Sequence, residues 1–377
     1  MKSKNKILFI ANKAPHYRLP FFNGLAKKEN IKFIFTNEKE KIIGLDANHK
    51  VIRGKCWGKF KIHLDLVRFL KKECPNNVVM LPPDPMHLLN NLLIYRFCKK
   101  NKINFFIWTE RWRYKQIPIK DKISNWLHKP LFKFVKKVFV PGMKSKEWAL
   151  AQGASNSQII LVPNASEIKF NLKDKEKIKK KIIKEHELKN KKIILYLGRL
   201  IKRKGINYLI EAFSKIKNKN VILIIVGGDD FYRLGEKSIK FKLKDQVKKL
   251  GLKNKIIFTG EIKHSKTAAY YSLADLFVYP SITYHQGEPW GLALNEAMQF
   301  GLPIISTDAV GAAYNLIKEG ENGFMVEEKN SEKLKIAFEK ILKNEKLQKK
   351  MGEKSREIIK KEYNYERMIC KFIWGLK

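Results

Sequence analysis

The chain has 377 residues, 44% of them hydrophobic, which is enough for about two domains of ~150 residues with cores of their own. Its 78 Lys and Arg residues against 36 Asp and Glu residues give a formal net charge of +42. This charge favours polyanionic ligands or an anionic membrane surface as partners, although a lysine-rich compositional bias gives the same number. No apolar run approaches the ~18 residues of a membrane span, and residues 7–11 are too short for the apolar part of a signal peptide.

The four cysteines show neither a CxxC pair nor the spacing of a metal site; they are Cys56, Cys74, Cys98 and Cys370. Reduced thiols are therefore expected. With them we expect a cytoplasmic protein that is soluble or peripheral on the inner face of the membrane.

Continuously apolar runs alternate with helical patterns through the first half of the chain. Such runs are typical of parallel strands that are covered on both faces. The strands expected there are residues 7–10, 31–36, 78–81, 103–108, 138–140 and 159–162. The helices expected between them are residues 19–28, 64–72, 86–99, 122–137 with an interruption at Pro130, and 144–153. The rest of residues 38–75 is ambiguous.

The same alternation starts again after a stretch rich in Lys and Glu. The strands expected in the second half are residues 193–197, 221–226, 256–258, 276–279, 303–306 and 324–326. Helices are expected from residue 206, over 236–250 and 265–273, from Gly291, and over 313–319. This alternation predicts an α/β fold with two Rossmann-like, doubly wound parallel sheets. The expected division is a domain over 1–165, a basic connecting segment with an exposed helix over 166–192, a second domain over 193–355 and a C-terminal helix over 356–377.

The stretch from Glu288 to Pro303 is where the chemistry is expected. Its helix begins near Gly291 and Leu292, and the unpaired N–H groups of a helix start suit an anion. Glu296 follows five residues after Gly291, and helical side chains lean back toward the N-terminus. Its carboxylate is therefore expected to reach the ribose hydroxyls of a nucleotide, and that of Glu288 to accept from sugar hydroxyls. Acidic residues near a helix start are also favoured by its dipole alone.

Two cations follow the first strand of the second half. Gly198 and Arg199 come directly after that strand, and Lys204 precedes the next helix. Because ligands of open α/β sheets bind at the carboxyl ends of the strands, these cations are placed to hold a diphosphate without a metal. The alternative is a pair of surface cations in a lysine-rich protein.

Several motifs of other enzyme classes are absent from the sequence. It contains no GxGxxG, no Walker GxxxxGK[ST], no HExxH and no GxSxG. These absences argue against a dehydrogenase, a P-loop NTPase, a zinc protease and a serine hydrolase. There is also no Asp-x-Asp, a signature of sites that bind a diphosphate through a metal ion.

Four motifs in order resemble the family 4 retaining glycosyltransferases of GT-B fold (glycosyl transferases group 1). They are Gly-Arg-Leu…Lys-Gly (198–205), Ala-Asp-Leu-Phe-Val-Tyr-Pro-Ser (274–281), Glu-Pro-Trp-Gly-Leu…Asn-Glu-Ala-Met…Gly-Leu-Pro (288–303) and Gly-Glu-Asn-Gly-Phe (320–324). The resemblance is strong over about residues 138–330 and weaker, though compatible, over 1–137. It implies two Rossmann-like domains facing each other across a cleft, the first receiving the acceptor and the second binding the nucleotide sugar. The C-terminal helix would cross back to the first domain.

The resemblance also implies roles for single residues. Arg199 and Lys204 would hold the donor diphosphate, Glu288 would contact the sugar, and Glu296 the ribose. Further contacts would come from Gly198, from the backbone of Gly291 and Leu292 at the sugar-phosphate, and from Gly260 and Glu261 beside the nucleobase. Arg199, Lys204 and Glu288 are the catalytic candidates. No metal and no cofactor are implied, since the nucleotide sugar is a substrate.

The first half departs from the family pattern at two places. Many relatives carry a Gly-Gly pair after the first strand, where this chain has Lys13-Ala14-Pro15-His16-Tyr17-Arg18. Many also carry a His after a mid-domain strand, where this chain has Trp108-Thr109-Glu110-Arg111. His16 and Glu110 are therefore further candidates, each with a structural role as the alternative.

Aromatic residues and cations are interleaved between Phe105 and Trp148. They are Trp108, Arg111, Trp112, Arg113, Tyr114, Lys115, Trp126, Lys129, Phe132, Lys133, Phe134, Lys136 and Lys137. Such a surface suits anionic lipid headgroups and, less well here, single-stranded nucleic acid. The alternative is that half of these aromatics belong to the core.

Together these patterns predict a retaining, metal-independent hexosyltransferase. It would move sugar from a UDP- or GDP-sugar to a growing, lipid-linked glycan in the biosynthesis of cell-surface polysaccharide or glycoconjugate. The alternative is a non-catalytic basic protein that uses the same fold to bind a membrane or RNA. The set of Arg199, Lys204, Glu288 and Glu296 favours the enzyme, because a binding module has no need of all four.

Overall fold

The computed structural model describes residues 5–36, 42–57, 60–80, 88–112, 119–228, 239–284 and 287–377. These residues form two compact units, one of residues 1–164 with 365–377 and the other of residues 165–364. Each unit is built on its own parallel sheet, one of seven strands and one of six, which confirms the predicted fold class. No helix in the described ranges has the length and apolar character that crossing a membrane requires.

The sheet of the first unit has the strand order β3-β2-β1-β6-β7-β8-β9, in which β1 pairs with both β2 and β6. Every pair in this sheet is parallel. The strands are β1 (Ile7–Ala11), β2 (Ile31–Phe35), β3 (His49–Val51), β6 (Asn77–Met80), β7 (Asn104–Trp108), β8 (Lys137–Val140) and β9 (Ile159–Leu161). A separate antiparallel hairpin pairs β4 (Lys55–Trp57) with β5 (Phe60–Ile62). The strands β3, β4 and β5 fall in the stretch that the sequence pattern leaves ambiguous.

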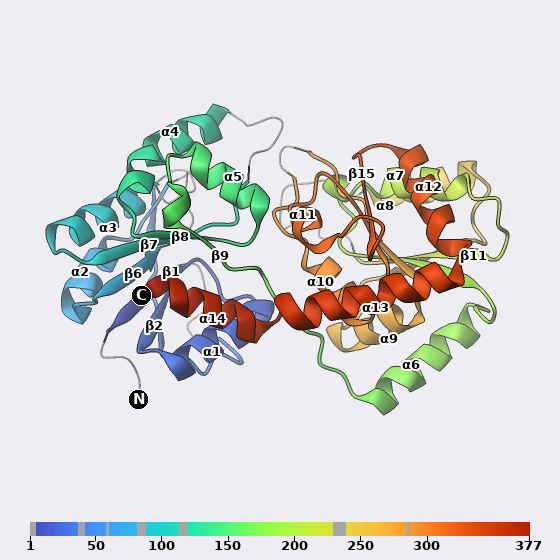
Figure 1. Ribbon diagram of the computed structural model, residues 1–377, viewed down its shortest axis with the longest axis horizontal. Coiled ribbons are helices and arrows are strands. Elements are labelled where there is room, and N and C mark those ends of the chain that lie inside the picture. The colour runs from blue at the N-terminus through green and yellow to red at the C-terminus, as the bar shows by residue number, and fades with distance from the viewer. Residues whose placement is uncertain are drawn as a thin grey trace. The chain divides into compact units, whose positions relative to one another are not determined.

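Helices cover both faces of the first sheet, which is why its strands are apolar throughout. They are α1 (Leu19–Lys28), α2 (Leu64–Glu73), α3 (Leu88–Lys100), α4 (Ile119–Phe134), α5 (Met143–Ala151) and α14 (Tyr365–Leu376), with 3₁₀ turns η1 (His16–Arg18) and η3 (Asn156–Gln158). The helices α1 and α14 pack side by side, opposite α3 and α4 (Figure 1). Phe372 of α14 is fully buried against Phe9, Phe21 and Phe139, so the end of the chain completes the first core.

The second unit has the strand order β12-β11-β10-β13-β14-β15, again entirely parallel. The strands are β10 (Lys192–Leu197), β11 (Val221–Val226), β12 (Ile256–Gly260), β13 (Leu276–Tyr279), β14 (Ile304–Thr307) and β15 (Gly323–Val326). The helices are α6 (Leu172–Glu185), α7 (Ile206–Ser214), α8 (Lys240–Lys249), α9 (Thr267–Leu273), α10 (Leu292–Gln299), α11 (Ala313–Leu316), α12 (Ser331–Leu342) and α13 (Glu345–Glu362), with η4 (Lys202–Lys204) and η5 (His264–Lys266).

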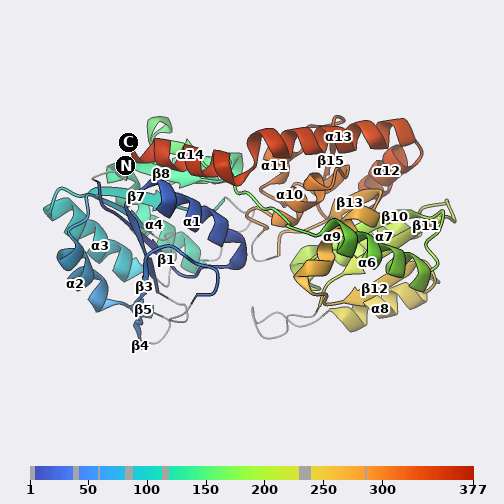
Figure 2. The same cartoon turned by 90° about the horizontal axis from the view of Figure 1, so that it is seen from below.

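Two helical layers sandwich the second sheet. The helix α7 packs against α8 and α12, while α6 packs against α9 and α10 against α13; Figures 1 and 2 both place α8 and α13 on opposite sides of the sheet. Asn171, Asn330 and Asn344 cap the starts of α6, α12 and α13 by accepting from backbone N–H groups, as an Asn before the first helical turn does.

One sequence-based expectation for the first unit is wrong. Pro130 lies inside α4, so it does not interrupt the helix. For the aromatic residues between Phe105 and Trp148, the alternative of a core position is confirmed for most of those in the described ranges; Phe105, Trp108, Trp112, Phe132 and Trp148 are all buried. Composition cannot separate an aromatic side chain that fills the core from one that faces solvent. Arg113, Tyr114 and Lys115 lie outside the described residues, as do the ends of the expected elements at 81, 86–87 and 236–238.

Candidate functional site

The carboxyl edge of the second sheet brings together the loops that follow β10 and β13. The turn η4 follows β10, and a loop after β13 leads to Glu288 and then to α10. The two loops are joined through the backbone, because the Ile282 N–H donates to the Arg203 carbonyl at 2.8 Å. Ligand sites of doubly wound sheets form at this edge.

Lys204, Arg203 and Glu288 form a buried cluster of charges at this edge. Lys204 Nζ and Arg203 Nη1 both donate to Glu288 Oε2, at 2.5 and 2.8 Å. Lys204 also donates to the Tyr279 hydroxyl, and Arg203 to the Gly287 carbonyl at 3.2 Å. Among the described residues Glu288 Oε1 accepts no hydrogen bond, so one carboxylate oxygen is saturated by cations and the other is left for a hydroxyl donor.

This cluster holds one anion against two cations. The pKa of Lys204 is lowered to about 8, mainly by burial and also by the charge of Arg203, although Glu288 raises it. Burial alone would raise the pKa of Glu288, but the charges of Lys204 and Arg203 outweigh it and hold that pKa below its usual range. The carboxyl is therefore ionised at neutral pH, and the excess of one positive charge in a desolvated place favours a bound anion.

A tight backbone arrangement fixes Glu288 and the start of α10. The Glu288 N–H donates to Ala309 and its carbonyl accepts from Gly311, at 3.0 and 2.9 Å. Gly291 precedes α10 with φ 94°, a left-handed conformation that suits glycine. A Cβ there would lie 2.9 Å from the Tyr279 ring. Glycine is therefore required where the N–H groups of the helix start approach the charge cluster.

Glu296 lies on α10 with both carboxylate oxygens engaged. Oε1 accepts from Ser166 at 3.0 Å and Oε2 from the Tyr271 hydroxyl at 2.9 Å. Burial raises the pKa of Glu296, and these hydrogen bonds offset only part of the increase. Each carboxylate oxygen has two acceptor sites, so the group still has capacity for ribose hydroxyls.

The glycine-containing loops after β10, β11 and β12 are in close contact. The Gly198 N–H donates to Val226, and the Gly227 N–H donates to Gly260 at 3.0 Å. A Cβ on Gly228 would lie 2.9 Å from the Cβ of Glu261. The structure therefore brings the predicted residues Gly198, Gly260 and Glu261 to one edge, with the Gly227–Gly228 pair between them.

Arg199 is placed at the same edge by its backbone. Its carbonyl accepts from the hydroxyl of the buried Tyr196 at 2.9 Å. Arg203 of the charge cluster and Tyr279, which accepts from Lys204, were not among the site residues predicted from the sequence. The run Lys202-Arg203-Lys204 was the available signal for Arg203, but only the 3₁₀ turn shows that Arg203 and Lys204 are both buried while Lys202 is exposed.

The two candidates in the first unit differ in their surroundings. Glu110 forms an ion pair with Arg18 and accepts from Asn164 at 3.0 Å. His16 is exposed in η1, with its ring edge-to-face against Tyr17 at 5.6 Å between centroids. The Arg18 guanidinium lies 4.6 Å from the Trp108 ring centroid, and burial lowers its pKa. Glu110 therefore has a structural partner, and a catalytic role for either residue stays a prediction.

Comparison with known proteins finds similarity to one family over the second unit. Residues 178–358 match the family described as glycosyl transferases group 1. The chain is 33% identical over 154 residues to an uncharacterized glycosyltransferase of Methanocaldococcus jannaschii, covering 41% of this chain and 36% of that protein. It is 29% identical over 200 residues to the capsular polysaccharide biosynthesis glycosyltransferase CapM of Staphylococcus aureus, covering 52% and 48%.

Among solved structures, HepE of Anabaena in complex with UDP has a TM-score of 0.79 at 17% identity, covering 98% of this chain and 99% of that one. This likeness concerns the fold. The chain spans 36% and 62% of the lengths of two curated relatives from M. jannaschii. The chain therefore has the GT-B fold, with two parallel sheets, and its residues 178–358 are similar to the glycosyl transferases group 1 family.

Proposed function

We propose that this protein is a retaining glycosyltransferase that moves a hexose from a nucleoside-diphosphate sugar to a growing glycan. The buried cluster of Lys204, Arg203 and Glu288 is the observation that carries the proposal. Its single excess positive charge suits a diphosphate leaving group, and the open oxygen of Glu288 suits a sugar hydroxyl. A module that only binds membranes or RNA has no use for a desolvated charge cluster at a sheet's carboxyl edge.

In the proposed reaction the bond between the sugar's anomeric carbon and the distal phosphate oxygen breaks. A bond from the acceptor's hydroxyl oxygen to that carbon forms, and the hydroxyl proton leaves with the nucleoside diphosphate. Lys204, Arg199 and the N–H groups of Gly291 and Leu292 would stabilise the negative charge that develops on the phosphate. Glu288 would orient the sugar, Glu296 the ribose, and Gly260 with Glu261 would border the base. Retention of configuration is inferred from the family.

UDP is the first nucleotide to test, because HepE, which shares the fold, was solved with UDP. GDP-sugars are the second choice. The acceptor is proposed to be a lipid-linked glycan, in line with the capsular polysaccharide assembly named for CapM. Peripheral binding to an anionic membrane, and with it a cytoplasmic location, is part of this proposal.

The membrane proposal rests on a surface of α3 and α4, here called the α3–α4 surface. It consists of the exposed apolar residues Leu89, Leu93, Ile123, Trp126 and Phe134. Ile123, Trp126 and Phe134 are 54%, 68% and 60% exposed, and the exposed cations Lys129 and Lys133 lie between or beside them in α4. Apolar side chains among cations are typical of interfacial helices.

The test of the proposed activity is a donor screen. Purified protein is incubated with UDP-, GDP- and ADP-sugars, and release of the nucleoside diphosphate is measured with and without membrane extract as acceptor. We expect turnover of a UDP- or GDP-sugar, abolished by Lys204→Ala. If no nucleotide sugar is bound or turned over while the protein binds RNA or vesicles tightly, the non-catalytic alternative is correct.

A further inference from the structure

Tyr279, the last residue of β13, lies against the charge cluster on two sides. Its hydroxyl accepts from Lys204, whose Nζ lies 4.4 Å from the Tyr279 ring centroid. The ring stacks on that of Tyr196 with centroids 6.5 Å apart and sits directly beneath Gly291. Tyr279 is therefore in contact both with the Lys204 ammonium and with Gly291 at the start of α10.

The contact between Lys204 and Tyr279 leaves two hydrogen-bond donors without an acceptor among the described residues. An ammonium has three donors and no acceptor, so the Tyr279 oxygen must accept in its bond with Lys204. Lys204 gives a second N–H to Glu288. Among the described residues the third N–H has no acceptor, and neither has the Tyr279 hydroxyl proton. Burial raises the pKa of Tyr279 well above its usual value, and Glu288 adds to this, so the phenol keeps its proton throughout the neutral range.

Two unused donors in a buried, positively charged place are costly unless an acceptor fills it. The start of α10, with its own unpaired N–H groups, adjoins the same ring. An anion oxygen bound here would accept from the Lys204 ammonium, from the Tyr279 hydroxyl and from the N–H groups at the start of α10. The adjoining Glu288 is the proposed sugar contact, and the phosphate bonded to the sugar is the distal one. The distal phosphate is therefore the one that belongs beside Tyr279.

We propose that Tyr279 is a donor-binding residue whose hydroxyl donates to the distal phosphate of the nucleoside diphosphate and at the same time holds the Lys204 ammonium in place. The proposal rests on the proposed function and assigns this residue a role that the sequence motifs leave open. The strand-ending tyrosine, rather than the helix start and the cations alone, then determines the preference for a diphosphate over a monophosphate.

The test compares the binding of UDP and UMP by wild type and Tyr279→Phe. The substitution keeps the ring and its packing and removes one hydroxyl. We expect the Kd for UDP to rise at least about tenfold, as for a hydrogen bond to a charged group. The Kd for UMP, which lacks the distal phosphate, should change by less than about threefold. UMP binding also shows that the variant is folded.

A second readout separates a role in holding Lys204 from a general packing role. Without the hydroxyl the ammonium loses an acceptor, so the decline of UDP affinity at alkaline pH should begin at a lower pH in Tyr279→Phe than in wild type. The matched control is Tyr363→Phe, because Tyr363 is also buried in this unit and its hydroxyl donates to the Asn315 carbonyl at 3.1 Å. We expect the control to bind UDP like wild type.

The outcomes separate the two proposals. If wild type binds neither UDP nor GDP, the proposed function fails and takes this inference with it. If wild type binds UDP, and Tyr279→Phe binds it equally well with the same pH dependence, the role of Tyr279 is refuted while the function stands. Equal losses for UDP and UMP would place the hydroxyl away from the distal phosphate and also refute the inference.

Discussion

At the scale of single residues, the net charge of the site depends on the protonation of Lys204. It is 4% exposed, and its stem and ammonium are enclosed by Tyr279, Glu288 and Arg203. A lysine in such surroundings is easier to deprotonate than one at the surface. Arginine residues stay charged in the same place, so the charge of the site depends on pH through Lys204.

The affinity for UDP should therefore fall as pH rises through about 8, the lowered pKa of Lys204. The anion binds the protonated form, so affinity is full below this pKa and is lost above it by up to about tenfold per pH unit. Calorimetric titration with UDP between pH 7 and pH 10 measures the decline, and Lys204→Met should show weak binding without it. Affinity that stays constant from pH 7 to pH 9.5 would mean that Lys204 does not contact the nucleotide.

Glu288→Gln should destabilise the second unit in the absence of ligand. The carboxylate neutralises two buried cations, and removing one partner of a buried ion pair costs about 3–5 kcal/mol. Urea unfolding followed by tryptophan fluorescence measures the loss, and UDP should restore more stability in this variant than in wild type because it supplies negative charge. Glu332→Gln, an exposed acid of the same unit, is the control and should leave the midpoint unchanged. A Glu288→Gln midpoint equal to wild type would show that the cations do not need this partner.

At the scale of elements, continuous apolar runs predict most strands because parallel strands are covered on both faces. The residues that follow the strands predict the edge at which the site lies, because ligands of open α/β sheets bind at the carboxyl ends of the strands. The pattern cannot predict β3, β4 and β5, which are three residues each and lack a distinctive run. Nor can it tell that Trp112 is buried while Trp126 of α4 is exposed, since both are aromatic residues that follow one another among cations in the sequence. Arg203 and Tyr279 were missed because their roles depend on which way a turn and a strand end face, and this is decided by tertiary packing.

The α3–α4 surface is expected to bind anionic membranes through its exposed apolar side chains. The double variant Ile123→Ala with Trp126→Ala keeps the charge and removes interfacial apolar area. It should weaken binding to vesicles of phosphatidylglycerol, measured by co-sedimentation. Wild-type binding should weaken as salt rises, since the Debye length falls from ~10 Å at 0.1 M to ~3 Å at 1 M.

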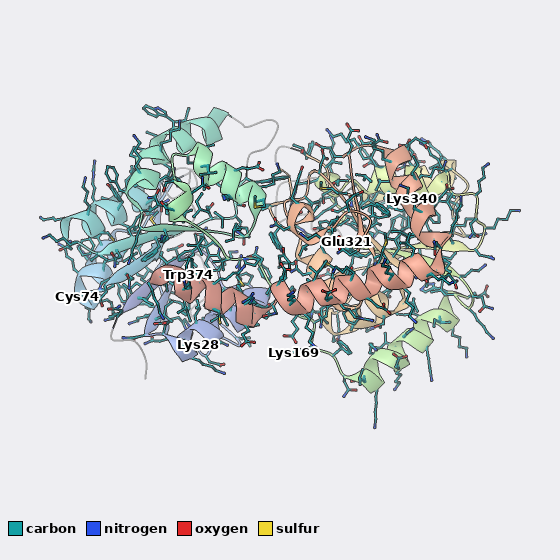
Figure 3. All side chains as sticks on the ribbon, in the orientation of Figure 1. Lys28, Cys74, Lys169, Glu321, Lys340 and Trp374 are labelled. Carbon is teal, nitrogen blue, oxygen red and sulfur yellow. The ribbon has the colours of Figure 1, made fainter. Side chains whose placement is uncertain are left out.

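Two exposed apolar residues outside this surface provide the control for that experiment. Phe241→Ala on α8 and Trp374→Ala on α14 also remove exposed rings at constant charge. Trp374 is labelled in Figure 3. Both should bind vesicles like wild type. If the α4 double variant binds as tightly as wild type, α4 is not the anchor. The net charge of +42 is then better explained by composition, and an acceptor that is not bound to a membrane is favoured.

For the whole molecule, we propose that side-chain cations stabilise a departing nucleoside diphosphate. Lys204 and Arg203 already occupy the buried edge of the second sheet with one excess positive charge, and Arg199 is placed beside them. Cations so placed take the part that a divalent metal ion plays in other phosphate-transferring sites. The transfer reaction should then proceed without added metal.

The most direct test measures the rate of UDP or GDP release from the preferred nucleotide sugar in EDTA, for wild type and for Arg199→Ala and Lys204→Ala. We predict that wild type keeps its rate in EDTA. Each variant should lose about a hundredfold or more, the scale of ~3 kcal/mol for one donor to a developing oxyanion. Loss of the wild-type rate in EDTA, with recovery on adding Mg²⁺ or Mn²⁺, would contradict a metal-independent reaction. Turnover of the donor at the wild-type rate by both purified variants, Arg199→Ala and Lys204→Ala, would contradict the role of these cations.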